Sequence, residues 1–222
     1  MSKKIQAIFF DLDSTLYNNR QYYLGAFKEV SHYLTKKYGI EERVIYQRLW
    51  KLWKNKTSSY KFLFNDLLAS FKINDRRAIN EVVKIFNGYA KEMKPYPDVI
   101  PVLKKLKERG YLLGIITDGN VRRQKRKIKL LGLAKFFKIV LYTKEIIAKP
   151  SPQPFLKARQ LSKTKPETIC YIGDNPEIDF AGAKRAGFKT VRILKGEFKK
   201  LAANKAIDFK IKRFNEILNI VG

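Results

Sequence analysis

The sequence predicts an α/β fold, a doubly wound parallel sheet whose chain is interrupted by an inserted α-helical bundle. From residue 98 onward, short apolar runs alternate with longer segments of helical periodicity, which is the pattern of crossover units in a parallel sheet. A further apolar run lies alone at residues 5–10, and a long helix-like stretch follows it. We therefore expect an α/β core over residues 1–16 and 95–222 and a helical insertion over residues 17–94.

The first strand is expected at residues 5–10, because this run is short, apolar and directly followed by polar residues. The insertion after it carries apolar residues at helical spacing in successive stripes. These stripes are Val30, Tyr33, Leu34 and Tyr38; Val44, Ile45, Leu49, Leu52 and Trp53; Phe62, Phe64, Leu67 and Leu68; and Ile79, Val82, Val83, Phe86 and Tyr89. Pro95 and Pro97 restrict the backbone where the chain returns to the core, so a hinge is expected there. Such an insertion could close over the carboxyl ends of the strands as a lid.

The rest of the chain supplies the remaining strands and helices. Strands are expected at residues 112–116, 138–142, 169–172, 190–194 and 209–211. Helices are expected between Asp98 and Gly110, between Asn120 and Gly132, after Pro152, at residues 177–186 and at residues 214–220. Asp98 and Asn120 stand where a helix N-cap belongs, and several of these helices end at a glycine.

The composition is that of a folded and strongly basic protein. Hydrophobic residues make up 45% of the 222 residues, and the formal net charge is +27. The single cysteine, Cys170, lies in an expected strand and is interpreted as a buried apolar residue; His32 is the single histidine. This scarcity excludes a disulfide framework and Cys/His zinc sites. The sequence shows no leader-like or membrane-length apolar run, so we expect a cytoplasmic protein without a membrane partner.

Two acids, Asp11 and Asp13, follow directly on the first expected strand. Ligands bind at the carboxyl ends of the strands in open parallel sheets, so an acid pair there is a candidate site. The same string could open a calcium loop, but that loop needs Gly at its sixth position and Glu at its twelfth, where this chain has Leu16 and Tyr22. The calcium interpretation is therefore rejected.

Further polar residues follow other expected strands and belong to the same edge of the sheet. They are Thr117, Asp118, Lys149, Asp174 and Asp179. Crowded carboxylates repel one another and any anionic substrate, and a hard dication with oxygen ligands, most simply Mg²⁺, offsets this repulsion. A lysine and a hydroxyl beside them would hold a phosphate group.

Segments at these strand ends carry a family resemblance. They read DLDST at Asp11, IITDGN around Thr117, AKPSPQPF at Lys149, and GDNPEIDFAGAKRAG from Gly173 to Gly187. In this order and spacing they resemble the motifs of the haloacid dehalogenase superfamily of phosphohydrolases, in the subfamily with an α-helical cap inserted after the first motif. The resemblance covers the whole α/β part and implies the Rossmann-like core of that family.

The resemblance implies catalytic roles for the matching residues. Asp11 would be the nucleophile that forms an aspartyl phosphate, and Asp13 would be first the general acid and then the general base. Thr117 and the backbone amide of Asp118 would bind phosphate oxygens, and Lys149 would offset charge on the nucleophile and the transition state. Asp118 stands where the family frequently has Asn, so only its backbone is assigned.

The resemblance also implies a metal site. Mg²⁺ would be held by the carboxylate of Asp11, the backbone carbonyl of Asp13 and the carboxylate of Asp174. Asp179 would support these ligands without contacting the ion directly. Ser14 stands where the family frequently has Gly, which is a small departure from the common pattern.

The expected function is that of a Mg²⁺-dependent phosphatase for a small phosphorylated metabolite. Asp13 argues against carbon–halogen cleavage, because family members with that activity lack an acid at this place. A phosphomutase with the same aspartyl phosphate, and a basic nucleic-acid-binding protein with or without end-phosphatase activity, stay open as alternatives. The sequence specifies neither the phosphoester nor the oligomeric state.

The helix expected after Asn120 is unusually basic. Its basic residues are Arg122, Arg123, Lys125, Arg126, Lys127 and Lys129, while Val121, Ile128 and Leu131 are left to face the core. We interpret the basic residues as a solvated face, since the basic excess is spread over the whole chain and no nucleic-acid motif accompanies it. Weak, sequence-independent nucleic-acid binding that fades with salt is the expected consequence.

Overall fold

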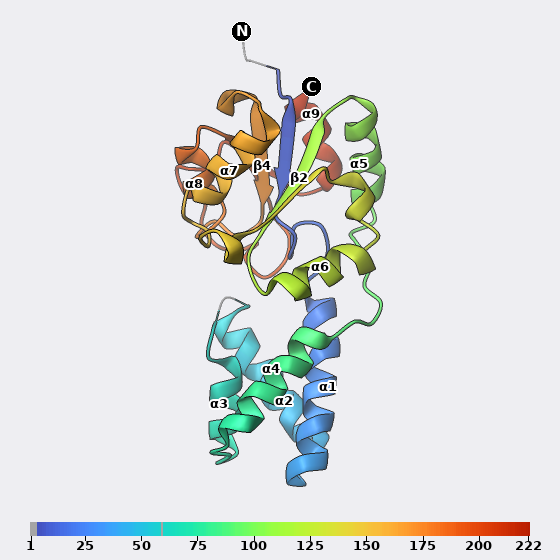
Figure 1. Cartoon of the computed structure of the whole chain (residues 1–222), viewed down its shortest axis with the longest axis vertical. Helices are drawn as coiled ribbons and strands as arrows, with labels where there is room; N and C mark the ends of the chain where they lie inside the picture. Colours follow the sequence, from blue (N-terminus) through green and yellow to red (C-terminus); the bar gives the residue numbers. More distant parts are fainter. Residues whose placement is uncertain (1–3, 59) are drawn as a thin grey trace. The chain divides into compact units, whose positions relative to one another are not determined.

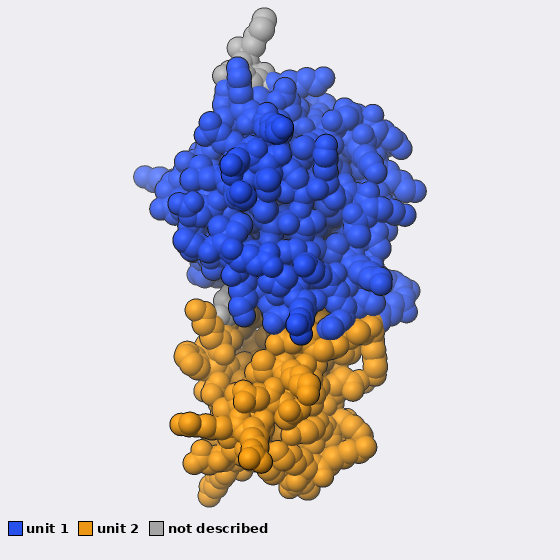
Figure 2. All heavy atoms as spheres, viewed as in Figure 1, with its two compact units in different colours: residues 1–19, 92–222 blue, residues 20–91 orange. Residues whose placement is uncertain are grey.

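The computed structural model describes residues 4–58 and 60–222, which fall into two compact units (Figure 2). One unit is formed by the chain up to residue 19 together with residues 92–222, and the other by residues 20–91. The insertion expected over residues 17–94 thus compares with a compact unit over residues 20–91.

The first unit is built on a six-stranded parallel sheet with the strand order β3-β2-β1-β4-β5-β6. The strands are β1 (Ala7–Phe10), β2 (Leu112–Thr117), β3 (Ile139–Tyr142), β4 (Ile169–Gly173), β5 (Lys189–Ile193) and β6 (Phe209–Ile211). The chain places β1 in the interior of the sheet and then adds strands on either side of it, so the predicted doubly wound parallel sheet is confirmed. The register pairs Phe10 with Ile115 in β2 and with Ile172 in β4, so these strands end at a common edge.

Helices cover both faces of this sheet (Figure 1). On one face lie α7 (Gln153–Ser162) and α8 (Phe180–Arg185). On the other lie α5 (Val99–Glu108) and α9 (Ile217–Val221). A further helix, α6 (Val121–Leu130), begins shortly after β2.

The side chains of β1 show how the core divides between the two faces. Successive residues of a strand point to opposite faces, and here Phe9 packs against Phe188 while Phe10 packs against Phe214, with ring centres 6.4 Å and 5.6 Å apart. Phe9 and Phe10 are both fully buried. A strand is expected to be apolar along its whole length where helices cover both faces of the sheet. This explains why apolar and polar residues do not alternate in β1.

The second unit contains α1 (Arg20–Tyr38), α2 (Glu42–Lys56), α3 (Leu63–Ser70) and α4 (Arg76–Gly88). Its core is aromatic: the ring of Phe86 lies 5.3 Å from that of Tyr22 and 5.2 Å from that of Phe64. Not every residue of the expected apolar stripes is buried, because Val44, Phe62 and Val83 are exposed.

The N-caps expected for α5 and α6 have different outcomes. Asn120 caps α6, since its side chain accepts a hydrogen bond from Arg123 N at 3.1 Å. The expectation for Asp98 is wrong, because its backbone is already helical and its carboxylate makes no capping bond. Instead, that carboxylate accepts from Phe214 N at 2.7 Å and from Lys195 Nζ at 3.3 Å, so tertiary contacts replace the local cap.

The helix expected at residues 177–186 is also shorter than predicted. It begins at Phe180, because side chains close a turn before it. Asn175 Oδ1 accepts from Glu177 N at 3.0 Å, and Asp179 Oδ2 accepts from Asn175 N at 2.9 Å. Asn and Asp compete in this way with helical hydrogen bonds.

The single cysteine and the single histidine differ in their exposure to solvent. Cys170 is fully buried in β4, as predicted, while His32 is exposed and lies 3.2 Å from Glu42. Over residues 4–58 and 60–222, no helix combines the length and the apolar character that crossing a membrane requires.

Candidate active site

The ends of β1, β2 and β4 bring the candidate polar residues together. Asp11 follows β1, Thr117 ends β2, and Asp174 follows β4. Because β1 lies between the other two strands, these residues are neighbours across adjacent strand ends. Their exposed fractions are 7%, 1% and 3%, so the polar groups face one another in a place largely removed from water.

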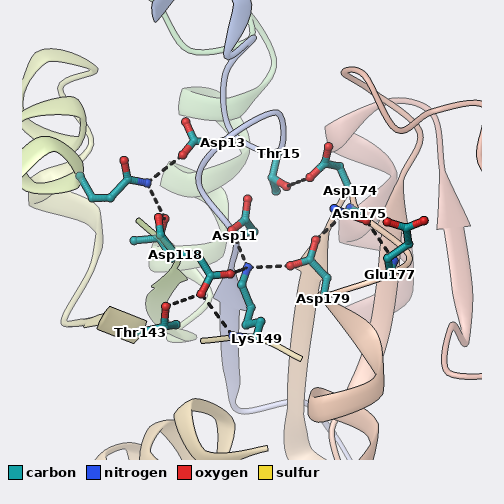
Figure 3. Close-up of polar contacts among 12 residues, drawn as sticks. Asp11, Asp13, Thr15, Asp118, Thr143, Lys149, Asp174, Asn175, Glu177 and Asp179 are labelled. Atoms are coloured by element: carbon teal, nitrogen blue, oxygen red, sulfur yellow. Dashed lines mark hydrogen bonds and ion pairs between the residues drawn. The ribbon is translucent and has the colours of Figure 1, made fainter. Parts of the chain in front are cut away.

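Lys149 is the centre of a buried ionic cluster (Figure 3). Its Nζ lies 2.7 Å from Asp11 Oδ1, 2.6 Å from Asp179 Oδ1 and 3.6 Å from Asp118 Oδ2. Burial by itself lowers the pKa of Lys149, but Asp11 and Asp179 raise it, and the result is a pKa well above the ordinary value. Lys149 therefore stays charged at neutral pH and holds the two carboxylates on either side of it.

Tyr171 completes this cluster from the interior of β4. Its hydroxyl accepts a hydrogen bond from Lys149 Nζ at 3.0 Å and donates one to Asp179 Oδ1 at 3.1 Å. The ring is fully buried and meets Phe155 edge-on at 4.9 Å. A tyrosine within an apolar strand gives no sequence signal for such a contact, and it is absent from the predicted site.

Asp179 supports Lys149 and the loop after β4 at the same time. Its Oδ1 faces Lys149 and Tyr171, and its Oδ2 accepts the backbone hydrogen bond of Asn175. This packing requires glycine at position 173, because a Cβ there would lie 2.4 Å from Asp179 Oδ2. Both carboxylate oxygens of Asp179 are thus engaged within the protein.

The environment of Asp11 and Asp174 disfavours their charged forms. Burial raises the pKa of Asp11 to about 7, against the lowering effect of Lys149. Burial, with Asp179 and Asp11 nearby, raises the pKa of Asp174 well above its ordinary value. Two neighbouring buried carboxylates of this kind require a positive charge in addition to Lys149 if both are to ionise.

Asp174 also offers a direct test of whether a cation fits. Its Oδ1 lies 3.5 Å from Thr15 Oγ1, and its Oδ2 is buried with no hydrogen-bond partner in the described part of the chain. A buried carboxylate oxygen without a donor is unusual in a folded protein, and a bound cation would satisfy it. The donor set of Asp11 and Asp174 consists of hard oxygens, which suits Mg²⁺.

No third side chain joins Asp11 and Asp174 as a metal ligand in the described part of the chain. Within residues 4–58 and 60–222, no group of three or more His, Cys, Asp or Glu side chains is placed to hold a metal ion. Mg²⁺ usually takes only one or two protein carboxylates and completes its shell with water and substrate oxygens. Asp11 and Asp174 with a backbone carbonyl are therefore compatible with this ion.

Asp13 is held by side chains from two different segments. Its Oδ1 accepts from Lys127 Nζ at 2.6 Å and from the hydroxyl of Tyr17, and its Oδ2 accepts from Gln124 Nε2 at 2.8 Å. Burial alone would raise the pKa of Asp13, but Lys127, Tyr17 and Gln124 together lower it to about 2. The carboxylate is therefore ionised in this arrangement, which differs from the protonated form that the expected general-acid role requires, and its side chain is 30% exposed.

The segment after β2 contributes a hydroxyl and a carboxylate. Gln124 Nε2 donates to Thr117 Oγ1 at 2.7 Å, which fixes the side chain that is the candidate phosphate ligand. The carboxylate of Asp118 accepts from the hydroxyl of Thr143 and from Lys149 N at 3.2 Å. The Asp118 side chain thus braces the segment that carries Lys149.

Ser14 shows why its position favours glycine. Its φ is 60°, in the left-handed region that residues with a Cβ rarely adopt. Gly196, with a φ of 68°, comes so close that a Cβ on it would lie 2.5 Å from Ser14 Cβ. The loop after β5 therefore packs tightly against the turn that carries Asp11 and Asp13.

Lys127 contradicts the sequence interpretation of a solvated basic face, because it is 3% exposed. Gln124, for which the sequence predicts no role, is fully buried. The assignment is wrong because α6 turns the positions 124, 127, 128 and 131 inward together, as residues three and four apart share a helix face. The presence of Ile128 and Leu131 on this face is the only sequence signal that could have placed Gln124 and Lys127 there.

Comparisons with known proteins agree with the motifs. Residues 8–193 match the family described as haloacid dehalogenase-like hydrolase. Glyceraldehyde 3-phosphate phosphatase of Methanopyrus kandleri is 33% identical over 227 residues, which cover 98% of this chain and 97% of that protein. Pyrophosphatase PpaX of Anoxybacillus flavithermus is 28% identical over 228 residues, with coverage of 98% and 97%. The crystal structure of a HAD phosphatase from Thermococcus onnurineus is similar with a TM-score of 0.71 and 26% identity over 98% of both chains.

Proposed function

Because the chain belongs to the haloacid dehalogenase-like hydrolases and is a phosphatase of that family, we propose that it hydrolyses a small phosphorylated metabolite through a phosphorylated Asp11. The observation that carries this proposal is the setting of Asp11, which is buried at the end of β1 with Lys149 at 2.7 Å. A carboxylate in contact with a fixed cation, next to a second carboxylate with a free oxygen, is suited to attack on an anionic ester.

Each nearby residue has a part in this chemistry. Asp11 attacks phosphorus and displaces the leaving oxygen, and Lys149 balances the charge that gathers at the phosphoryl group. Thr117 donates its hydroxyl to a phosphate oxygen. Asp13, which is ionised before substrate binds, would take up a proton as the anionic ester enters the site, give that proton to the leaving oxygen and later take one from the water that hydrolyses the acyl phosphate, which returns Asp11 to its free form.

Mg²⁺ is part of the proposal. The Asp11 carboxylate, the Asp13 backbone carbonyl and the Asp174 carboxylate would hold it, and Asp179 would assist from behind through Lys149 and the loop after β4. When bound, it would offset the repulsion between Asp11, Asp174 and the phosphate. The unpartnered Oδ2 of Asp174 is the observation that favours this assignment.

The relatives narrow the class of substrate that we propose. Relatives at 33% and 28% identity are a glyceraldehyde 3-phosphate phosphatase and a pyrophosphatase, and both names denote small phosphorylated compounds. We therefore propose a small, soluble phosphate compound, with glyceraldehyde 3-phosphate as the first candidate to measure. A cytoplasmic location is part of this proposal.

The experiment is phosphate release from glyceraldehyde 3-phosphate, pyrophosphate and 4-nitrophenyl phosphate with Mg²⁺ present. Asp11→Asn is expected to lower turnover of the accepted compounds by at least about 10³-fold, because it removes the nucleophile. Glu108→Gln, an exposed acid on α5, is the matched control and should keep the parental rate. A folded Asp11→Asn protein with the parental rate would overturn the mechanism.

A further inference from the structure

The inward face of α6 carries two polar residues at positions where apolar ones would pack. Gln124 and Lys127 are three residues apart and lie on the same side of the helix as Ile128, which is 4% exposed. The helix has other basic residues, and Arg122, Lys125 and Lys129 are exposed. Lys127 alone among these is withdrawn from water, at 3% exposed.

Burying an ammonium group has a cost that needs a compensating partner. A lysine loses hydration when it is buried, and only a close opposite charge with good geometry restores the balance. Lys127 Nζ has such a partner in Asp13 Oδ1 at 2.6 Å. The pair connects α6 to the loop after β1, across 114 residues of sequence.

The contacts around Asp13 fix its carboxylate from more than one side. Lys127 and Tyr17 both donate to Oδ1, and Gln124 donates to Oδ2. Gln124 uses the same nitrogen to contact Thr117 Oγ1 at 2.7 Å, so one amide spans the carboxylate and the hydroxyl. A carboxylate bound in this way has little freedom to rotate.

We propose that Lys127 is a positioning residue for Asp13, and that Gln124 fixes the position of this carboxylate relative to the hydroxyl of Thr117. The inference rests on the proposed function, in which Asp13 exchanges protons with the leaving oxygen and with water. Lys127 touches neither. Its ion pair keeps Asp13 ionised before substrate binds, and it holds the carboxylate where, once the anionic ester has entered and Asp13 has taken up a proton, that proton is passed to the leaving oxygen. The loss of a positioned general acid is greatest for esters whose leaving oxygen is strongly basic.

A purely structural role for Lys127 makes a different prediction. If the ion pair only anchored α6, its removal would weaken folding and would lower turnover of every ester to the same extent. If Lys127 acts through Asp13, its removal has an effect that depends on the leaving group and that disappears once Asp13 is replaced.

The test compares Lys127→Met with Lys129→Met, an exposed lysine on the same helix, in turnover of glyceraldehyde 3-phosphate and 4-nitrophenyl phosphate. For Lys127→Met, kcat should fall by about 10- to 100-fold on the alkyl ester and by less than about threefold on the activated aryl ester. Lys129→Met should match the parental protein on both. Lys127→Arg, which keeps the charge, should recover part of the loss on the alkyl ester.

A double-mutant cycle with Asp13→Asn gives the second measurement. In the Asp13→Asn background, Lys127→Met should change kcat on the alkyl ester by less than about twofold, because the residue through which it acts is already gone. Additive losses, or equal losses on both esters, would overturn the inference. If Lys127→Met does not fold, as judged by circular dichroism, Lys127→Gln is read by the same criteria.

The outcomes separate this inference from the proposed function. A parental protein that releases phosphate from neither ester, although it is folded and supplied with Mg²⁺, overturns the proposed function and this inference with it. A parental protein that is active, with Lys127→Met variants that show no dependence on the leaving group, overturns the inference alone.

Discussion

Lys149 Nζ lies 2.7 Å from Asp11 Oδ1, so the candidate nucleophile and the cation of the site are in direct contact. The contact opposes the effect of burial, which raises the pKa of Asp11. It also joins two distant parts of the chain, because Asp11 ends β1 while Lys149 comes after β3.

Lys149→Met should lower phosphate release by roughly 10²- to 10³-fold, because the charge that faces the transferring phosphoryl group is lost. Lys149→Arg should retain more activity than Lys149→Met, although the larger guanidinium cannot reproduce the contacts with Asp11 and Asp179. Steady-state kinetics on 4-nitrophenyl phosphate measure both. Lys157→Met, an exposed lysine on α7, is the control. Parental turnover in a folded Lys149→Met protein would remove Lys149 from the mechanism.

Tyr171→Phe should reduce activity as well as stability. The substitution keeps the ring in its place against Phe155 and removes only the hydroxyl that links Lys149 to Asp179. Losing a buried hydrogen-bonding group costs about 1 to 3 kcal/mol of stability, and turnover should fall by about tenfold as Lys149 loses a partner.

The control for this variant is Tyr111→Phe. Tyr111 is also buried, and its hydroxyl donates to Val221 O at 2.9 Å, but it stands before β2 at the opposite end of that strand from Thr117. Its replacement should lower the melting temperature without changing kcat. If both variants lost stability and neither lost activity, Tyr171 would be only a packing residue.

Some residues of this site can be predicted from the sequence and others cannot, because only some of them lie at positions that the strand pattern marks. Asp11, Thr117 and Asp174 follow apolar strands, so the pattern that predicts the strands also places these residues at their carboxyl ends. Lys127 and Tyr171 have no such signal. Their places depend on which face of α6 turns inward and on which neighbours a buried strand residue meets.

The same limit explains the errors in local structure. Asp98 has the sequence context of an N-cap, yet its carboxylate binds Phe214 N, a donor that is 116 residues away. The turn before α8 depends on Asp179, whose carboxylate is in turn fixed by Lys149. In both cases a tertiary contact overrides a local preference, and local preferences are what a single sequence conveys.

Mg²⁺ should raise the melting temperature of the parental protein, and Asp174→Asn should abolish most of this rise. The reason is that a ligand which binds only the folded state stabilises it, by about 2.7 kcal/mol at a hundred times its Kd. Asp174 Oδ2 is buried without a hydrogen-bond partner in the described part of the chain, so replacing this carboxylate should weaken Mg²⁺ binding. Thermal denaturation with and without MgCl₂ measures the shift, independently of activity.

The control for the metal prediction is Asp208→Asn, which removes a carboxylate that pairs with Lys184 near the surface. This variant should keep the full Mg²⁺-dependent shift, whatever its own melting temperature. An unaltered shift in Asp174→Asn would exclude Asp174 as a ligand.

The stability of the helical unit should depend on pH through Asp75. Its carboxylate accepts from Lys37 Nζ at 3.1 Å, Tyr38 Oη at 2.9 Å and Arg77 N at 2.8 Å, and these bonds lower its pKa to about 2. A folded-state pKa below the unfolded value of about 3.9 means that Asp75 stabilises the unit above pH ~4 and loses this effect as the pH falls toward 2.

Asp75→Asn tests this pH dependence because Asn keeps the cap on α4 and removes only the charge. The variant should melt at a lower temperature than the parental protein at pH 7, and the two melting curves should converge toward pH 2. Glu81→Gln, which removes an exposed carboxylate 3.8 Å from Lys84, is the control and should change little at either pH. A difference for Asp75→Asn that stays constant from pH 7 to pH 2 would contradict the charge-based explanation.

The net charge of +27 leads to the last prediction, weak and salt-sensitive binding of nucleic acid. The structure removes Lys127 from the accessible charge of α6 and leaves Arg122, Lys125 and Lys129 exposed. Replacing these exposed residues with Gln should lower the slope of log K against log salt for duplex DNA by at most about 3, since each phosphate contact contributes roughly 0.9. Turnover of small esters should be unchanged, because none of them touches Asp11, Asp13 or Asp174. Filter binding at several salt concentrations gives the slope.

Tight binding at physiological salt, together with no activity on small esters, would instead favour a nucleic-acid function, because a phosphatase with a diffuse basic surface has no reason to bind a polyanion tightly at that ionic strength.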